Sequence, residues 1–226
     1  MWQEILSIIA ALALAALLAR QFLDAMAKQK AAPGLMFETA KTLLDEPRIS
    51  SGPAVGTHVL TGTYKGHAVQ VKIITDTLAT RKLPSLWLMV TIPENLPLNC
   101  TFDMMMRPAG PTTFSNFDSL PVTVERPHDF PEHAVLKTDD PAHLLPSHLV
   151  APHLGPFFGP GPKELLITPG GIRMVSLLAE ADRARYGVFR QADFGGTRLD
   201  PATLIDHLER LLALRAAIEN WHAEHS

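Results

Sequence analysis

The sequence predicts an α+β protein with an N-terminal transmembrane helix, a mostly antiparallel β-sheet and a long C-terminal helix that covers the sheet. Residues 5–19 form a continuous apolar run, alternating apolar and polar residues begin at Thr57, and a helical apolar pattern occupies the end of the chain. No strand–helix–strand alternation of about 30 residues appears, so a parallel nucleotide-binding sheet is not expected.

The N-terminal segment has the composition of a membrane anchor. Residues 5–19 read ILSIIAALALAALLA. Extending this helix back to the first residue gives about 28 Å, just enough for the ~30 Å hydrocarbon core of a bilayer. A tryptophan and an arginine then fall at the two interfaces, where amphipathic rings and long basic side chains reside. The residues expected to contact lipid are Trp2, Ile5, Leu12, Leu17 and Arg20.

Other interpretations of this segment are a cleaved signal peptide, an in-plane helix and a buried core helix. A signal peptide requires a basic leading region, but Gln3 and Glu4 stand there. Residues 5–19 offer no polar face for an in-plane helix. Arg20, Lys28 and Lys30 follow the run, and basic residues are retained in the cytoplasm. We therefore expect a single-pass signal-anchor protein with its N-terminus outside and its C-terminal domain cytoplasmic.

The remaining chain is expected to form one soluble domain. We assign residues 1–27 to the anchor, 28–56 to a tether with a short amphipathic helix (35–46), and 57–226 to the domain. The net charge of −3 argues against nucleic acid as a partner. The single cysteine excludes an intrachain disulfide and any pair of cysteines for zinc or redox chemistry.

Strands account for most of the predicted domain. Lys65-Gly66 and Pro169-Gly170-Gly171 have the composition of hairpin turns between alternating segments. The expected strands cover residues 57–64, 67–75, 85–93, 98–108, 121–127, 133–139, 163–168, 172–180 and 186–194. Pro47 is expected to end the short helix, and residues 48–56 to form a loop.

Helix signals appear at two Asp-Pro pairs. Asp140-Pro141 starts a segment that Pro146 and Pro152 interrupt, so it should form short helical turns. Asp200-Pro201 precedes the strongest helical pattern in the chain. Its apolar stripe consists of Leu204, Ile205, Leu208, Leu211, Leu212 and Ile218.

The motif search finds no GxGxxG, GxxxxGK[ST], GxSxG or HExxH. Histidine is abundant, and with Asp129 and Glu132 it could supply metal ligands. The candidates are His128, His133, His143, His148 and His153. Their spacing follows no regular ligand pattern, which favours ordinary loop histidines, and no cofactor is expected.

Two further sets of residues suggest contact surfaces. Lys65, Lys72, Arg81 and Lys82 could meet anionic headgroups, although such sites usually hold ~4–8 clustered charges. Phe157 and Phe158 stand between Gly-Pro pairs, where one ring could be exposed at a partner surface, although filling the edge of the core is the favoured interpretation for both.

These observations favour a non-enzymatic role. We expect a membrane-anchored accessory or interaction protein, a peripheral subunit or assembly factor whose partners are the lipid bilayer and other membrane-protein subunits. One alternative is a tethered metal-dependent hydrolase that uses the histidine cluster. The other is an anionic-lipid-binding domain that uses the basic residues.

Overall fold

The computed structural model describes residues 13–20, 34–52, 57–76, 83–108, 110, 112–189 and 192–225. Its strands are β1 (Asp45–Ser51), β2 (Thr57–Tyr64), β3 (His67–Asp76), β4 (Ser85–Ile92), β5 (Phe102–Met106), β6 (Val122–Val124), β7 (Ala134–Thr138), β8 (Pro162–Thr168) and β9 (Gly171–Glu180). Its longer helices are α3 (Arg183–Phe189) and α4 (Pro201–His225). Shorter helical turns are η1 (Ala40–Leu43), η2 (Phe117–Ser119), η3 (Pro141–His143), α2 (Ser147–Val150), η4 (Ala151–His153) and η5 (Gly155–Phe158).

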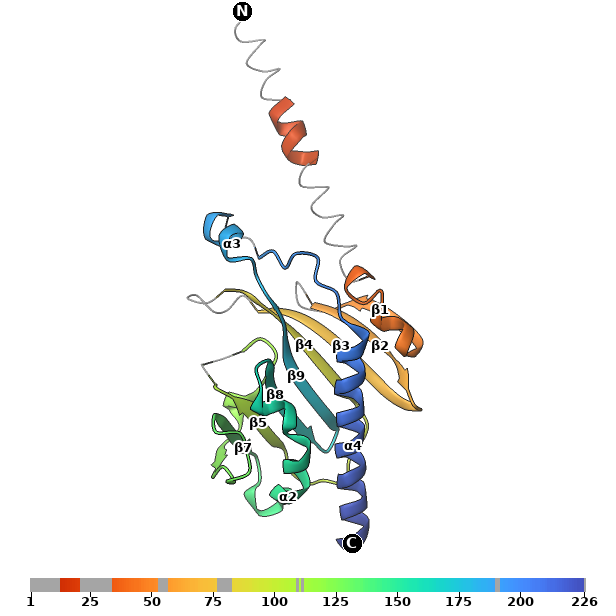
Figure 1. The fold of residues 1–226 in the computed structure, drawn as a ribbon, viewed down its shortest axis with the longest axis vertical. Coiled ribbons are helices and arrows are strands. Elements are labelled where there is room, and N and C mark those ends of the chain that lie inside the picture. Colours follow the sequence, from red (N-terminus) through yellow and green to blue (C-terminus); the bar gives the residue numbers. More distant parts are fainter. Residues whose placement is uncertain are drawn as a thin grey trace, which may run out of the picture.

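All nine strands join one sheet in the order β1-β2-β3-β4-β9-β8-β5-β7-β6. Every neighbouring pair is antiparallel. The first four strands form a meander, and the β8–β9 hairpin then inserts between β4 and β5 (Figure 1). Strands far apart in the sequence therefore lie side by side in the second half of the sheet.

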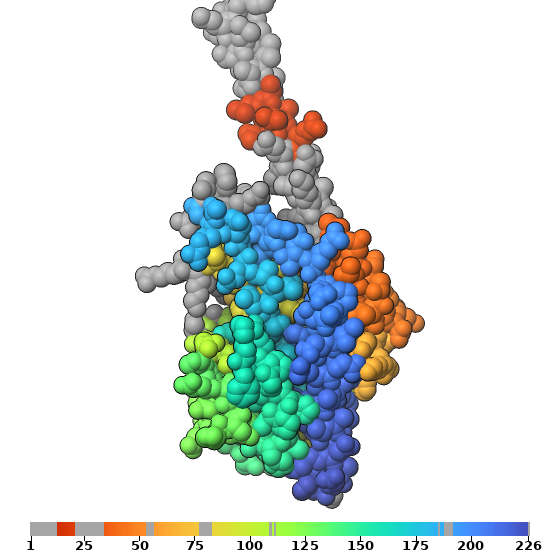
Figure 2. Space-filling model, in the orientation of Figure 1, coloured from red at the N-terminus to blue at the C-terminus, as the bar shows by residue number. Residues whose placement is uncertain are grey.

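The main core lies between one face of the sheet and the helices. On β4, Leu86, Leu88 and Val90 alternate towards this face and are fully buried. Leu204 and Leu208 of α4 pack against them. The short helices α2 and η4 lie beside α4 over the same core (Figure 2). Four residues of the predicted apolar stripe of α4 are thus buried, and two are half-buried; the buried ones are Leu204, Leu208, Leu211 and Ile218, the others Ile205 and Leu212.

A smaller apolar cluster covers part of the opposite face. Met89, Met105 and Val175 project from three strands of this face. Phe114 and Phe117, from the segment between β5 and β6, pack on them. This segment, residues 112–120, shields the second face and leaves a hollow beside the cluster.

The prediction of a transmembrane helix is wrong. Only residues 13–20 of the N-terminal segment are described as helix. Among the described residues, no helix combines the length and apolar character needed to cross a membrane. The single-pass, signal-anchor assignment is corrected with it, as is the expected localisation with an outside N-terminus and a cytoplasmic domain.

The anchor residues divide between described and undescribed parts of the chain. Trp2, Ile5 and Leu12 lie outside the described residues. Leu17 is 52% exposed and Arg20 is also exposed, both within the described helical residues 13–20.

Residues 35–51 also differ from the prediction. Instead of one helix over residues 35–46 and a loop, the chain forms a short helical turn at residues 34–36, then η1 and the edge strand β1. Pro47 is accommodated because the register of β1 shifts between Asp45 and Arg48, and bulged edge strands tolerate proline. Phe37 and Ala40 are fully buried in the main core, so this segment packs with the sheet.

The strand predicted at residues 186–194 is wrong as well. The chain forms α3 there, and the Tyr186 N–H donates to the Asp182 carbonyl at 2.9 Å. A short apolar run does not distinguish helix from strand, whereas an aspartate before the run is a helix-start residue. The other predicted strands and the C-terminal helix are present in the structure.

Candidate functional site

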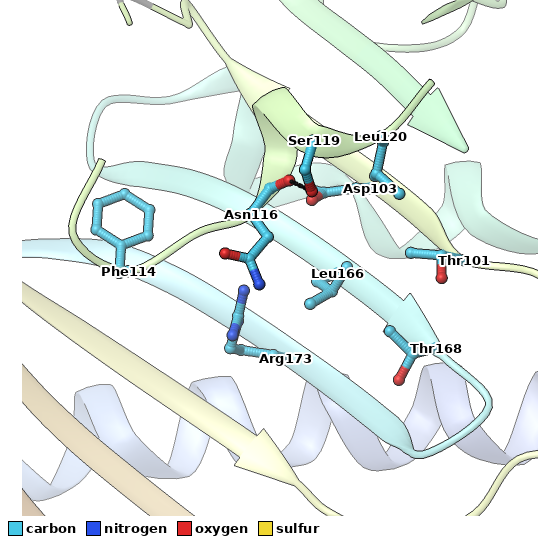
Figure 3. A pocket seen from close by; sticks show the side chains of 9 residues that line it. All are labelled: Thr101, Asp103, Phe114, Asn116, Ser119, Leu120, Leu166, Thr168 and Arg173. Carbon is cyan, nitrogen blue, oxygen red and sulfur yellow. Dashed lines mark hydrogen bonds between the residues drawn. The ribbon is translucent and has the colours of Figure 1, made fainter. Parts of the chain in front are cut away.

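A pocket of ≈ 310 Å³ opens on the sheet face opposite α4 (Figure 3). Strands β5, β8 and β9 form its floor, and residues 112–120 form one wall. The lining side chains belong to Thr101, Asp103, Phe114, Asn116, Ser119, Leu120, Leu166, Thr168 and Arg173. This mixture of a few polar groups with apolar surface is typical of small-molecule sites.

The antiparallel register places three lining residues in one row. Asp103 on β5 is opposite Leu166 on β8, and Leu166 is opposite Arg173 on β9. Glu164 precedes Leu166 by two residues and therefore shares its face. Its side chain is diagonal to both Asp103 and Arg173, within reach of long side chains. Three ionisable groups from three strands are thus gathered on one face.

One ion pair joins two of these groups. The Arg173 Nη2 donates to Glu164 Oε2 at 2.9 Å, and Glu164 is fully buried. Asp103 is only 2% exposed. Within the described part of the chain, Asp103 Oδ1, Glu164 Oε1 and Arg173 Nε are buried without a hydrogen-bond partner. The cluster therefore contains buried donor and acceptor atoms that make no hydrogen bond, and leaving such atoms unpaired lowers the stability of the fold.

Burial raises the pKa of Asp103 to about 8, and the nearby charge of Glu164 adds to the rise. Arg173 and Lys137 oppose this pKa rise through their positive charges. Two carboxyl groups in one poorly solvated cluster do not both ionise easily. Asp103 is therefore the group that holds a proton at neutral pH.

Hydrogen bonds fix the rim of the pocket. Ser119 Oγ donates to the Asn116 carbonyl at 2.6 Å, which tightens the wall segment (Figure 3). The backbone N–H and the hydroxyl of Thr101 donate to Asp139 at 2.7 and 2.8 Å. Thr168 Oγ1 donates to the Gly171 carbonyl at 3.2 Å in the β8–β9 turn. The pocket is therefore preformed by its own scaffold.

The structure does not gather the candidate histidines. His128, His133, His143 and His148 are exposed, and His153 is half-buried. His143 Nδ1 lies 2.7 Å from Asp140 Oδ2, within a single helical turn. Across the described ranges, no group of three or more His, Cys, Asp or Glu side chains is placed to hold a metal ion.

The basic candidates are dispersed too. Lys65 Nζ lies 2.6 Å from Glu209 Oε1 of α4, so its charge is paired. Lys72 is half-buried on β3. Arg81 and Lys82 lie outside the described residues.

The two adjacent phenylalanines separate. Phe157 is 1% exposed and packs in the main core, whereas Phe158 is 64% exposed. Only Phe158 therefore remains available as a contact residue.

Sequence reasoning missed Asp103, Glu164 and Arg173. The available signal was a charged residue inside an otherwise apolar strand, as in FDMMM, KELLI and GIRMV. That signal marks each residue alone, because only the strand order and register show that the three share one face.

No known protein family matches the chain, and no curated protein matches it. One solved structure is similar, the crystal structure of the mycobacterial trehalose monomycolate transport factor A, TtfA. It shares 9% sequence identity, with a TM-score of 0.42, over 83% of this chain and 94% of that chain. A likeness of this size supports no conclusion about this chain.

Proposed function

We propose that this protein is an accessory or interaction protein that associates with a membrane by inserting apolar side chains into the lipid surface without crossing it. The observation that carries the proposal is the exposure of the helical segment at residues 13–20. Leu14, Leu17 and Leu18 are 57%, 52% and 56% exposed, respectively.

The exposed surface of this helical segment is almost entirely apolar. The residues between the leucines are alanines, and all eight residues are exposed. Leu14, Leu17 and Leu18 stand at positions i, i+3 and i+4 and therefore form one exposed stripe of the helix. Such a stripe can enter the lipid surface from one side, without the helix crossing the bilayer. Arg20 is the last described residue of the segment, and its long side chain can reach headgroup phosphates.

A flotation experiment tests the proposal. The full chain is mixed with phosphatidylcholine vesicles, with and without phosphatidylserine. The triple variant Leu14→Gln/Leu17→Gln/Leu18→Gln is compared with a control that changes two further large apolar residues exposed in the described part of the chain, Leu35→Gln/Phe158→Gln. Because burying each leucine is worth about 1.5–3 kcal/mol, the triple variant should bind vesicles at least about tenfold more weakly.

Each outcome has a defined meaning. Flotation of the wild type and of the control, with loss in the triple variant, supports lipid insertion. Equal flotation of the triple variant overturns the role of residues 13–20. Co-purification with a membrane-protein subunit but no binding to pure vesicles overturns the lipid contact and makes a protein the partner.

Salt separates this proposal from the headgroup alternative. Apolar insertion changes little with salt, whereas attraction to anionic headgroups is screened. Binding that disappears in high salt and in Arg81→Gln/Lys82→Gln would favour the basic residues instead.

A further inference from the structure

The pocket on the sheet face opposite α4 is separate from the exposed leucines of the proposed membrane contact. We propose that this pocket binds a small primary amine, whose ammonium group pairs with the Asp103 carboxylate beneath the 112–120 segment. Nothing in the sequence motifs or in the comparisons assigns this site.

Asp103 is the reason to expect a ligand. It lines the pocket, is 2% exposed, and its Oδ1 has no hydrogen-bond partner among the described residues. A carboxyl group buried in this way is normally paired or hydrogen-bonded. Lys137 stands opposite Asp103 in the β5–β7 register and Arg173 lies on the same face, but neither forms an ion pair with Asp103 among the described residues. Arg173 is engaged with Glu164, and Lys137 Nζ lies over the Phe117 ring at 5.0 Å from its centroid.

The charge of the cluster selects a cation. Asp103, Glu164 and Arg173 together carry one net negative charge when all are ionised. An anionic ligand would face the Glu164 carboxylate beside the Asp103 carboxyl group, while the guanidinium is already satisfied on one side by Glu164. A divalent metal would need more ligands, since the described residues place no group of three metal-ligating side chains. An ammonium group supplies one charge and several donors.

The other lining atoms suit the rest of such a molecule. Ser119 Oγ and the side-chain amide of Asn116 are further polar groups of the pocket lining. Leu166, Leu120 and Phe114 supply apolar surface for a short hydrocarbon body (Figure 3). Arg173 Nε is a buried donor without a partner within the described residues, so an oxygen near the amine would add to the fit. A volume of ≈ 310 Å³ limits the ligand to a small molecule.

Binding should release a proton. The pKa of Asp103 stands at about 8 because of burial and the charge of Glu164 on β8, opposed by Arg173 on β9 and Lys137 on β7. On the covering segment, Asp118 of η2 is exposed. An ammonium ion must displace the Asp103 proton below this pKa. The affinity should therefore fall by close to ~10-fold for each pH unit below it.

The test is calorimetric titration of the full chain with three matched probes. Leucinol carries an ammonium group, a hydroxyl and a branched alkyl body. In 4-methyl-1,2-pentanediol a hydroxyl replaces the amine, and 2-hydroxy-4-methylpentanoate is the matched anion. We expect leucinol to bind at least about tenfold more tightly than the other two, because only it neutralises the buried carboxylate.

Variants and buffers complete the test. Asp103→Asn keeps the shape and removes the charge, so it should lose the preference for leucinol. Asp118→Asn changes an exposed acid near the pocket and should bind as the wild type does. Titration of the wild type in buffers with different ionisation enthalpies measures the proton release directly and does not depend on a variant that folds.

Four results would overturn the proposal. For the wild type, these are no binding of leucinol, equal binding of the diol, or binding without proton release at pH 7. The fourth is equal leucinol affinity in a folded Asp103→Asn protein.

Discussion

Ser176 on β9 and His207 on α4 are joined by a hydrogen bond of 2.9 Å between Ser176 Oγ and His207 Nε2, inside the interface between sheet and helix. His207 Nδ1 lies 2.8 Å from the Thr203 carbonyl, so Nδ1–H donates there and Nε2 accepts from the serine hydroxyl. Both residues are less than one-tenth exposed. The neutral histidine therefore satisfies a polar contact where α4 docks.

This contact should make the stability depend on pH. Burial holds the pKa of His207 below its ordinary value of 6.5. As pH falls through that value, the unfolded chain takes up the proton first, so the free energy of unfolding decreases. Urea unfolding at pH 8, 7, 6 and 5 should show this loss. His207→Gln should reduce the slope, and an unchanged slope would contradict the assignment.

Removing the serine hydroxyl tests the same contact at neutral pH. Ser176→Ala leaves the Nε2 of His207 buried without a donor, which should cost about 1–3 kcal/mol of unfolding free energy. An exposed serine offers the control, since Ser147→Ala should change the stability by less than about 0.5 kcal/mol.

Removing one partner of the buried ion pair should lower the free energy of unfolding more than removing both. Arg173→Met leaves the fully buried Glu164 without its partner and should cost about 3–5 kcal/mol. Glu164→Leu/Arg173→Met should recover most of that loss, because both charges are then absent. The exposed pair of Arg210 and Asp206 supplies the control, and Arg210→Met should cost only about 0.5 kcal/mol. Chemical denaturation measures all three, and a double variant as unstable as the single one would contradict the expectation.

The β8–β9 turn contains two glycines, Gly170 and Gly171, and the backbone requires a glycine at the second position. Gly171 has a φ of +145°, and a Cβ there would lie 2.3 Å from the Ile92 carbonyl oxygen. Gly171→Ala should therefore destabilise the protein by at least about 2 kcal/mol. Gly170→Ala meets only Thr168 Oγ1, at 3.8 Å, and should be nearly neutral. Thermal unfolding distinguishes the two variants.

The single cysteine should be unreactive in the folded protein. Cys100 is 1% exposed, and its Sγ–H donates to the His143 carbonyl at 2.9 Å. Burial raises the pKa of this thiol, and the charges of Asp139 and Asp140 add to the rise. Because the thiolate is the reactive form, a thiol reagent should label Cys100 only after denaturation. Ser147→Cys places a thiol on the surface and should react at once, which shows that the reagent works.

Much of the fold was predictable from local pattern. The Lys65-Gly66 turn, the alternation in β3 and the Asp200-Pro201 helix start depend on neighbours in the sequence, and the structure contains all three elements. Asp140 likewise accepts from the Ala142 N–H at 2.9 Å, as a helix-start residue does.

The errors arose where local pattern was ambiguous. The apolar run at residues 5–19 satisfied the composition of a transmembrane helix, but the described helix there covers only residues 13–20. Pro47 suggested the end of a helix, yet a bulged edge strand accepts it equally well. Residues 183–189 form a helix although their apolar run also fits a strand.

The α+β class, most strands and the C-terminal helix follow from local sequence, because backbone propensity and side-chain periodicity act over a few residues. The site depends on long-range packing. Asp103, Glu164 and Arg173 meet because the β8–β9 hairpin inserts beside β5 and sets the register. The same long-range packing buried Phe157, exposed Phe158 and kept the histidines apart. These choices depend on contacts between distant segments, which no local pattern encodes.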